Sequence, residues 1–322
     1  MSDRTHDIPI TPVACRVSPG RLNQLRMLAA WCHAEIGPEG LESLSEIVVT
    51  PRENISGASN EFMARCGDSP RVRTSAGAVS VPAVAGGRLT AAIVLDVADL
   101  NAFDQTHADL DYFALTLLEE MLHIRHYSVT FQHRGFIHYD LPDQCQTNLF
   151  ELAYHLLDEY LVGRWKANVI TAEICYGGNL PEDIEEGLRA LAEVVTEAAS
   201  ARLAINEAWM QTADVISGPT FGALVREAGR RANRDTPSPA GEPATSAMFR
   251  TDIAPYWDPT LRHLEQAFAD LQSEDEMVAN IASQLVAFLS HCGVTLSPMP
   301  EGGCWLNFAS HWADALIPSR PA

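Results

Sequence analysis

Long apolar runs, a basic charge excess and a secretory leader are all missing from this sequence. No stretch approaches the ~18 uninterrupted apolar residues that a membrane-spanning helix needs, so we expect no membrane partner. The first nine residues have neither the basic start nor the apolar core of a signal peptide, which makes a cytoplasmic location the expectation. Lys and Arg number 22 against 42 Asp and Glu, and the net charge of −20 disfavours nucleic acid as a partner.

Cysteine is scarce and scattered along the chain. The seven cysteines are odd in number and include no Cys-x-x-Cys pair, so the sequence predicts neither a disulfide framework nor a thiolate zinc site. No local feature marks any of them as a catalytic nucleophile. We therefore expect reduced, mostly buried thiols at Cys15, Cys32, Cys66, Cys145, Cys175, Cys292 and Cys304.

The arrangement of apolar residues and turn residues predicts an α+β, predominantly helical fold. The 322 residues, 47% of them hydrophobic, are enough to bury a sizeable core. The first section is mixed, with a helix at 20–36, a turn at 37–40 and strands near 46–50, 79–81 and 89–95. The remainder is predicted to be helical at 111–128, 146–170, 181–216, 219–232, 258–272, 275–292 and 305–317.

These elements suggest four regions. We expect a metal-binding region over 1–170 and a helical extension over 171–233. The Pro-, Ser- and Gly-rich stretch within 234–250 lacks periodicity and predicts a flexible loop or linker. A C-terminal helical region over 251–322 completes the chain.

The strongest functional signal lies in Leu117-Leu118-Glu119-Glu120-Met121-Leu122-His123-Ile124-Arg125-His126. On a helix, Glu119, His123 and His126 fall within one narrow stripe, with Glu120 beside it. Leucine, methionine and isoleucine cover most of the remaining circumference, so the helix is expected to be buried nearly all round. Buried carboxylates are costly unless a cation or hydrogen bonds compensate them, and a metal ion is the simplest such cation.

A second predicted helix repeats this pattern. Glu151, His155 and Glu159 are spaced at i, i+4 and i+8 and share one face, with Asp158 adjacent. Six of the eleven histidines lie between positions 107 and 155, across both helices and the loop that joins them. Imidazole and carboxylate together suit zinc, iron or manganese. The alternative is that these are ordinary polar residues that are hydrogen-bonded inside a helical core.

The order of elements and the first stripe resemble the zincin metallopeptidases. That family runs from an N-terminal helix through a small sheet into a helix bearing His-Glu-x-x-His, and its gluzincin-like members add a downstream glutamate ligand. One register fits this chain: Glu119 takes the first-histidine position, Glu120 the general-base position and His123 the second-histidine position. Glu159 resembles the downstream glutamate. The motif is therefore a degenerate Glu-Glu-x-x-His, with a carboxylate where the family has a neutral imidazole.

The resemblance implies a hydrolase of amide or peptide bonds that acts on a peptide or an amide-containing small molecule. Glu119, His123 and Glu159 would bind the divalent metal, most of all zinc, and Glu120 would be the general base. The two negative ligands would make the metal a weaker Lewis acid than three histidines do. The further ligands or substrate contacts that we expect are His126, His155, Glu151, Asp158, His133, His138, Tyr154 and Tyr160.

Two other functions use the same residues differently. Glu120 to His123 also reads as the Glu-x-x-His of a dinuclear carboxylate-bridged oxidase, although the chain contains no second copy of this motif. The other alternative is a catalytically inactive zincin-like module that binds a protein partner through its C-terminal helical region. The acidic stretch that begins at Pro181 is part of that region.

Overall fold

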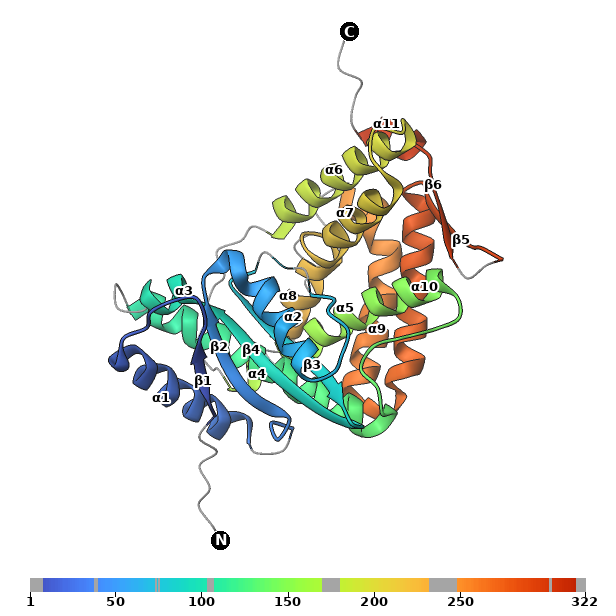
Figure 1. Ribbon diagram of the computed structural model, residues 1–322. Helices are drawn as coiled ribbons and strands as arrows, with labels where there is room; N and C mark the ends of the chain where they lie inside the picture. Colours follow the sequence, from blue (N-terminus) through green and yellow to red (C-terminus); the bar gives the residue numbers. More distant parts are fainter. Residues whose placement is uncertain are drawn as a thin grey trace. The chain divides into compact units, whose positions relative to one another are not determined.

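The computed structural model describes residues 8–37, 40–72, 74, 76–102, 107–169, 180–231, 248–300 and 303–316 (Figure 1). The chain divides into two compact units, Met1–Ile137 and His138–Ala322, and each is described here on its own. The boundary precedes the helix that carries Glu151 and Glu159, so this helix belongs to the second unit. The predicted N-terminal region, 1–170, includes it. The fold is the predominantly helical α+β class that the sequence predicts.

The first unit is a mixed sheet with helices on both faces. Its strands stand in the order β1-β2-β4-β3; β1, β2 and β4 are parallel, and the edge strand β3 is antiparallel to β4. In chain order its elements are β1 (Ile10–Pro12), α1 (Pro19–Ile36), β2 (Leu44–Thr50), the 3₁₀ turn η1 (Arg52–Asn54), α2 (Ile55–Arg65), β3 (Ala78–Ala85), β4 (Arg88–Asp96), α3 (Val97–Ala102) and α4 (His107–Arg134).

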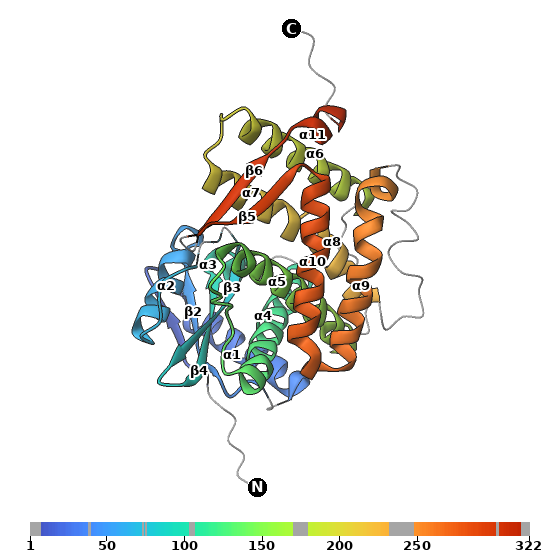
Figure 2. The same cartoon turned by 90° about the vertical axis from the view of Figure 1, so that its right-hand side faces the viewer.

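Alternation along the strands builds the two faces of this sheet. Val48, Ala92 and Val94 pack in one buried cluster with Ile55 and Phe62 of α2. The intervening residues of β2 and β4 point to the opposite face, because successive side chains of a strand alternate. Figures 1 and 2 show α1 and α4 on that opposite face, and α4 packs against β3 and β4.

Local signals explain why α1 forms where the sequence predicts it. The Ser18 hydroxyl accepts a hydrogen bond from the Arg21 N–H, and Pro19 takes the first helical position. Gly37 ends the helix with φ of 85°, a conformation that glycine adopts without steric cost. The predicted helix at 20–36 and the strands near 46–50, 79–81 and 89–95 are confirmed.

The described residues of the second unit form helices and one hairpin (Figure 2). The helix α5 packs against α8 and α10, α10 packs against α9, and α6 packs against α7. In chain order the elements are α5 (Gln144–Val169), α6 (Leu180–Ala199), α7 (Ile205–Ser217), α8 (Phe221–Arg231), the π-helical turn η4 (Phe249–Ile253), α9 (Ala254–Ala269), η5 (Leu271–Ser273), α10 (Glu274–His291), β5 (Val294–Pro298), β6 (Cys304–Phe308) and α11 (His311–Leu316).

Two predicted helices in this unit are wrong in part. The stretch 181–216 is two helices, α6 and α7, separated where Ala201 takes a positive φ of 55°. The stretch 305–317 begins as the strand β6, and only its second half is the helix α11. Most of the expected linker at 234–250 lies outside the described residues. Within the residues that are described, no helix is long and apolar enough to cross a membrane.

The expectation that all cysteines are reduced is wrong. Cys145, in the first turn of α5, and Cys304, at the start of β6, form a disulfide across a sequence separation of 159 residues. Sequence spacing carries no information about such a pair, because the fold alone brings the two Cα atoms to 5.1 Å. Of the free thiols, Cys32 and Cys292 are buried, whereas Cys15 and Cys66 are partly exposed; Cys175 lies outside the described residues.

Candidate functional site

The first predicted stripe lies on the buried helix α4 of the first unit. From Phe113 to Phe131 no residue of this helix is fully exposed, which confirms the expectation of burial nearly all round. His123 is 7% exposed and His126 is completely buried. Glu119 and Glu120 are half-buried. Each imidazole ring centroid lies 6.4 Å from that of Tyr127, so His123 and His126 flank one tyrosine ring.

The second predicted stripe lies on α5, in the second unit, and its carboxylates face protein donors. Glu151 accepts a hydrogen bond from the Tyr139 N–H at 2.5 Å and lies 3.3 Å from His138 Nδ1. Glu159 lies 3.6 Å from Arg226 Nη1 of α8 and 4.0 Å from His155 Nε2. The guanidinium of Arg226 is always positively charged, so it compensates the charge of Glu159. The sequence analysis predicts a metal ion in this role.

The remaining predicted contacts differ widely in exposure. Asp158 is 2% exposed and Tyr154 is 5% exposed, whereas His155 and His133 are exposed. His133 lies in the last turn of α4, which extends to Arg134 and so beyond the predicted end of this helix at residue 128.

Tyr160 is fully buried, and its hydroxyl accepts a hydrogen bond from Arg164 Nη1 at 3.1 Å. Arg164 also stacks 4.1 Å from the centroid of the Phe268 ring. Burial raises the pKa of the Tyr160 phenol, partly offset by the guanidinium of Arg164. This tyrosine is therefore held as a neutral packing group within the helices.

The predicted donors are divided between the two units. Glu119, Glu120, His123, His126 and His133 belong to the first unit, and the others belong to the second. Across the part of the chain that the structure describes, no three His, Cys, Asp or Glu side chains are gathered in a group that could hold a metal ion. What α4 offers is a pair, Glu119 and His123, spaced one helical turn apart.

The free thiols are not poised as nucleophiles. Burial raises the pKa of Cys32 to about 12 and that of Cys292 well above its usual value, with Asp252 adding to the effect at Cys292. Burial also raises the pKa of the Cys15 and Cys66 thiols. The thiolate is the reactive form, so these four side chains are poor nucleophiles at neutral pH.

Two polar clusters in the structure are not predicted from the sequence. In the first unit, Thr50 and Asp96 end the paired strands β2 and β4. In the second unit, the buried carboxylate of Asp252 accepts hydrogen bonds from His291 Nε2 and Trp312 Nε1, each at 2.9 Å. The partners are far apart in sequence, so helix or strand periodicity could not have found them. A carboxylate directly after a buried strand, as Asp96 is, was the one available signal.

Comparison of the chain with family models, with curated proteins and with solved structures finds no match. The resemblance to zincins therefore rests on the Glu-Glu-x-x-His motif and on the order of elements in the first unit.

Proposed function

We propose that this protein is a metal-dependent hydrolase of amide or peptide bonds whose central groups lie on α4. The observation that supports this most is the nearly complete burial of His123 on a helix that packs against the sheet, one turn from the half-buried Glu119. Two ligands at i and i+4 on a rigid helix are a recurrent way of holding zinc.

The chemistry of this proposal is divided between the metal and Glu120. Glu119 and His123 would hold a divalent ion, zinc first and iron or manganese as alternatives, which would supply Lewis-acid polarisation of the substrate carbonyl. Glu120 takes a proton from the attacking water and returns it to the leaving nitrogen.

Glu159 is the third ligand that the resemblance assigns, and its metal role stays a prediction. In the second unit its carboxylate lies beside Arg226, so a metal at Glu159 would have to displace that guanidinium. A ligand set with Glu119 and Glu159 would carry two negative charges, which would weaken acidification of the nucleophilic water.

One observation favours a second candidate function, an inactive zincin-like module that binds a protein partner. Glu151 and Glu159 already have hydrogen-bonding or cationic partners within the protein, so neither needs a metal for charge compensation. A metal-free protein whose thermal stability does not respond to a chelator would support this module over the hydrolase.

Three variants of α4 test the hydrolase. His123→Ala should lose the metal, whereas Glu120→Gln should keep it and reduce the hydrolysis of a fluorogenic peptide library by about 10²-fold or more. Gln132→Ala removes an exposed polar side chain of the same helix and is the matched control, with no change expected in either measurement. Full metal content in His123→Ala, or full activity in Glu120→Gln, would contradict the proposal.

Glu119→His tests the first ligand separately, because it restores the usual His-Glu-x-x-His motif. A neutral imidazole is a better zinc ligand in this position than a carboxylate, so the variant should bind zinc more tightly in a competition titration. Unchanged zinc affinity would show that Glu119 is not a ligand.

A further inference from the structure

The carboxyl ends of β2 and β4 form a second polar site in the first unit, separate from α4. Thr50 and Asp96 are the last pair in the parallel register of these two strands. Ligands of open α/β sheets bind outside the carboxyl ends of parallel strands, because the following loops and helix starts converge there. This end of the sheet is therefore where a ligand is expected on topological grounds.

Thr50 and Asp96 point to the same face of the sheet. Val48 and Val94 lie in the cluster beneath α2, and the alternation of each strand puts residues two positions further on the same side. Thr50 is completely buried, and its Oγ1 has no hydrogen-bond partner within the described structure. A buried hydroxyl without a hydrogen-bond partner costs about 1–3 kcal/mol of stability. The presence of the Thr50 hydroxyl at this position, next to Asp96, therefore points to a bound ligand that supplies the missing partner.

Asp99, three residues beyond Asp96, brings a second carboxylate to this place. The Asp96 N–H donates a hydrogen bond to the Gly77 carbonyl at 2.7 Å. A Cβ added to Gly77 would collide with Asp99 Oδ2, so the Asp99 carboxylate lies against the same glycine. Asp96 is 3% exposed, and its Oδ1 accepts a hydrogen bond from the Ala98 N–H at 2.9 Å. Burial and the charge of Asp96 raise the pKa of Asp99, and Arg52 opposes that effect.

We propose that Thr50, Asp96 and Asp99 bind a hard divalent cation, Mg²⁺ or Ca²⁺, at the carboxyl end of β2 and β4. The donors are two carboxylates and one hydroxyl, all of them oxygen, which is the set that these ions prefer and that zinc does not. The cation gives the Thr50 hydroxyl the partner that it lacks and offsets the repulsion between the two aspartates. The strongly acidic chain further favours a cation over an anion.

Arg52 is the competing cation at this site. It lies on η1, directly after β2, and its side chain is exposed. A Cβ added to Gly77 would lie 3.5 Å from Arg52 Nη2 and would also collide with Asp99 Oδ2. The guanidinium of Arg52 and the carboxylate of Asp99 therefore lie near each other beside this glycine. A divalent ion must displace this guanidinium from Asp99, which sets the direction of one variant in the test below.

Isothermal titration of the chelator-treated full chain with MgCl₂ and with CaCl₂ tests the proposal. The experiment uses the His123→Ala background, so that failure of the α4 metal site does not affect the result. One ion per chain is expected, with a Kd on the order of 10⁻⁴ to 10⁻³ M. Asp99→Asn should weaken binding at least about tenfold. Glu61→Gln, which removes an exposed carboxylate from α2, should leave the affinity unchanged.

Two further variants separate a ligand role from a structural one. Thr50→Val removes the unpartnered hydroxyl while keeping the side-chain shape, so it should fold, gain thermal stability without the ion, and lose the stability increment that the ion gives the parent protein. Arg52→Ala should tighten binding several-fold. No binding of either ion up to 10 mM, equal affinity in Asp99→Asn and Glu61→Gln, or weaker binding in Arg52→Ala would each overturn the proposal.

Discussion

A single buried carboxylate, Asp252, joins three segments of the second unit. Its Oδ1 accepts hydrogen bonds from His291 at the end of α10 and from Trp312 of α11, and it lies in the π-helical turn before α9. The carboxylate is 6% exposed, and the indole of Trp312 is 7% exposed. The Trp312 donor therefore depends on this acceptor in surroundings with little water, whereas the His291 side chain is 31% exposed.

Replacing this acceptor tests the importance of the cluster. Asp252→Ala leaves the buried Trp312 N–H without its acceptor and removes the partner of the partly exposed His291, and should lower the free energy of unfolding by about 1–3 kcal/mol. Asp258→Ala, at an exposed position on α9, is the matched control and should change it by less than about 0.5 kcal/mol. Urea unfolding measures both, and equal effects in the two variants would contradict this role for Asp252.

At the scale of elements, the close packing of α8 against α5 depends on Gly229. A Cβ on Gly229 would lie 2.7 Å from the Tyr160 carbonyl oxygen and 3.1 Å from Gly163 Cα, both of them backbone atoms of α5. Backbone cannot move aside as a flexible side chain can, so this close approach requires that Gly229 have no side chain.

Two glycine substitutions of opposite expected sign test this contact. Gly229→Ala forces α8 away from α5 and should destabilise the second unit by about 1–3 kcal/mol. Gly57→Ala, on α2, meets no atom within 4 Å and should stabilise the first unit by about 0.5–1 kcal/mol, because alanine has the higher helix propensity. Thermal unfolding of both variants gives the signs. Stabilisation by Gly229→Ala would show that the helices do not approach so closely.

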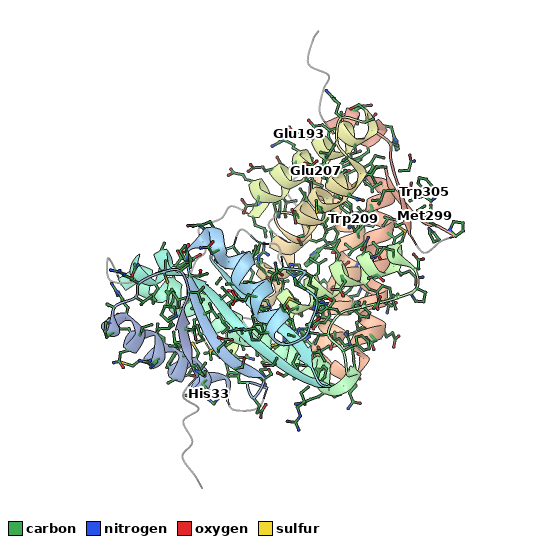
Figure 3. All side chains as sticks on the ribbon, viewed as in Figure 1. His33, Glu193, Glu207, Trp209, Met299 and Trp305 are labelled. Carbon is green, nitrogen blue, oxygen red and sulfur yellow. A yellow bond between two sulfur atoms is a disulfide. The ribbon has the colours of Figure 1, made fainter. Side chains whose placement is uncertain are left out.

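Most elements could be predicted because their periodicity is long and their ends carry turn residues. The helix α1 has Ser18 and Pro19 at its start and Gly37 at its end, and it was found nearly to the residue. The break between α6 and α7 was missed because Ala201, rather than glycine or proline, takes the positive φ there. The i, i+3 spacing of Trp305 and Phe308 predicts a helix, but in the strand β6 the two side chains point to opposite faces, and Trp305 (labelled in Figure 3) is 57% exposed.

The candidate site was predictable in part, and the reason is physical. Burial of α4 with His123 inside follows from the apolar residues around its circumference. The partners of the second stripe could not be predicted, since Arg226 is a residue of α8 that reaches Glu159 only through tertiary packing. The same is true of Thr50 and Asp96, whose pairing depends on the order of the strands.

At the scale of the whole molecule, the Cys145–Cys304 disulfide links distant parts of the second unit covalently. It ties the first turn of α5 to the hairpin β5–β6. A crosslink over so long a loop stabilises mainly by restricting the unfolded chain, by about 2–5 kcal/mol in typical cases. The cytoplasmic location stays a prediction.

Thiol chemistry tests this link. Cys304→Ser should lower the melting temperature of the second unit, and dithiothreitol should do the same to the parent protein while leaving Cys304→Ser unaffected. Cys66→Ser, at a free and partly exposed cysteine, is the control and should respond to dithiothreitol as the parent does. If the reductant leaves the parent melting temperature unchanged, and the denatured mass gains no hydrogen on reduction, the two cysteines are not bonded.

The metal content of freshly purified protein tests the central claim most directly. Elemental analysis of the parent chain should find one zinc, iron or manganese per chain, removable by a chelator together with hydrolytic activity, and His123→Ala should have lost it. A parent chain without any of these metals, whose activity and thermal stability are the same before and after chelation, would contradict the account of α4 as a metal-binding helix.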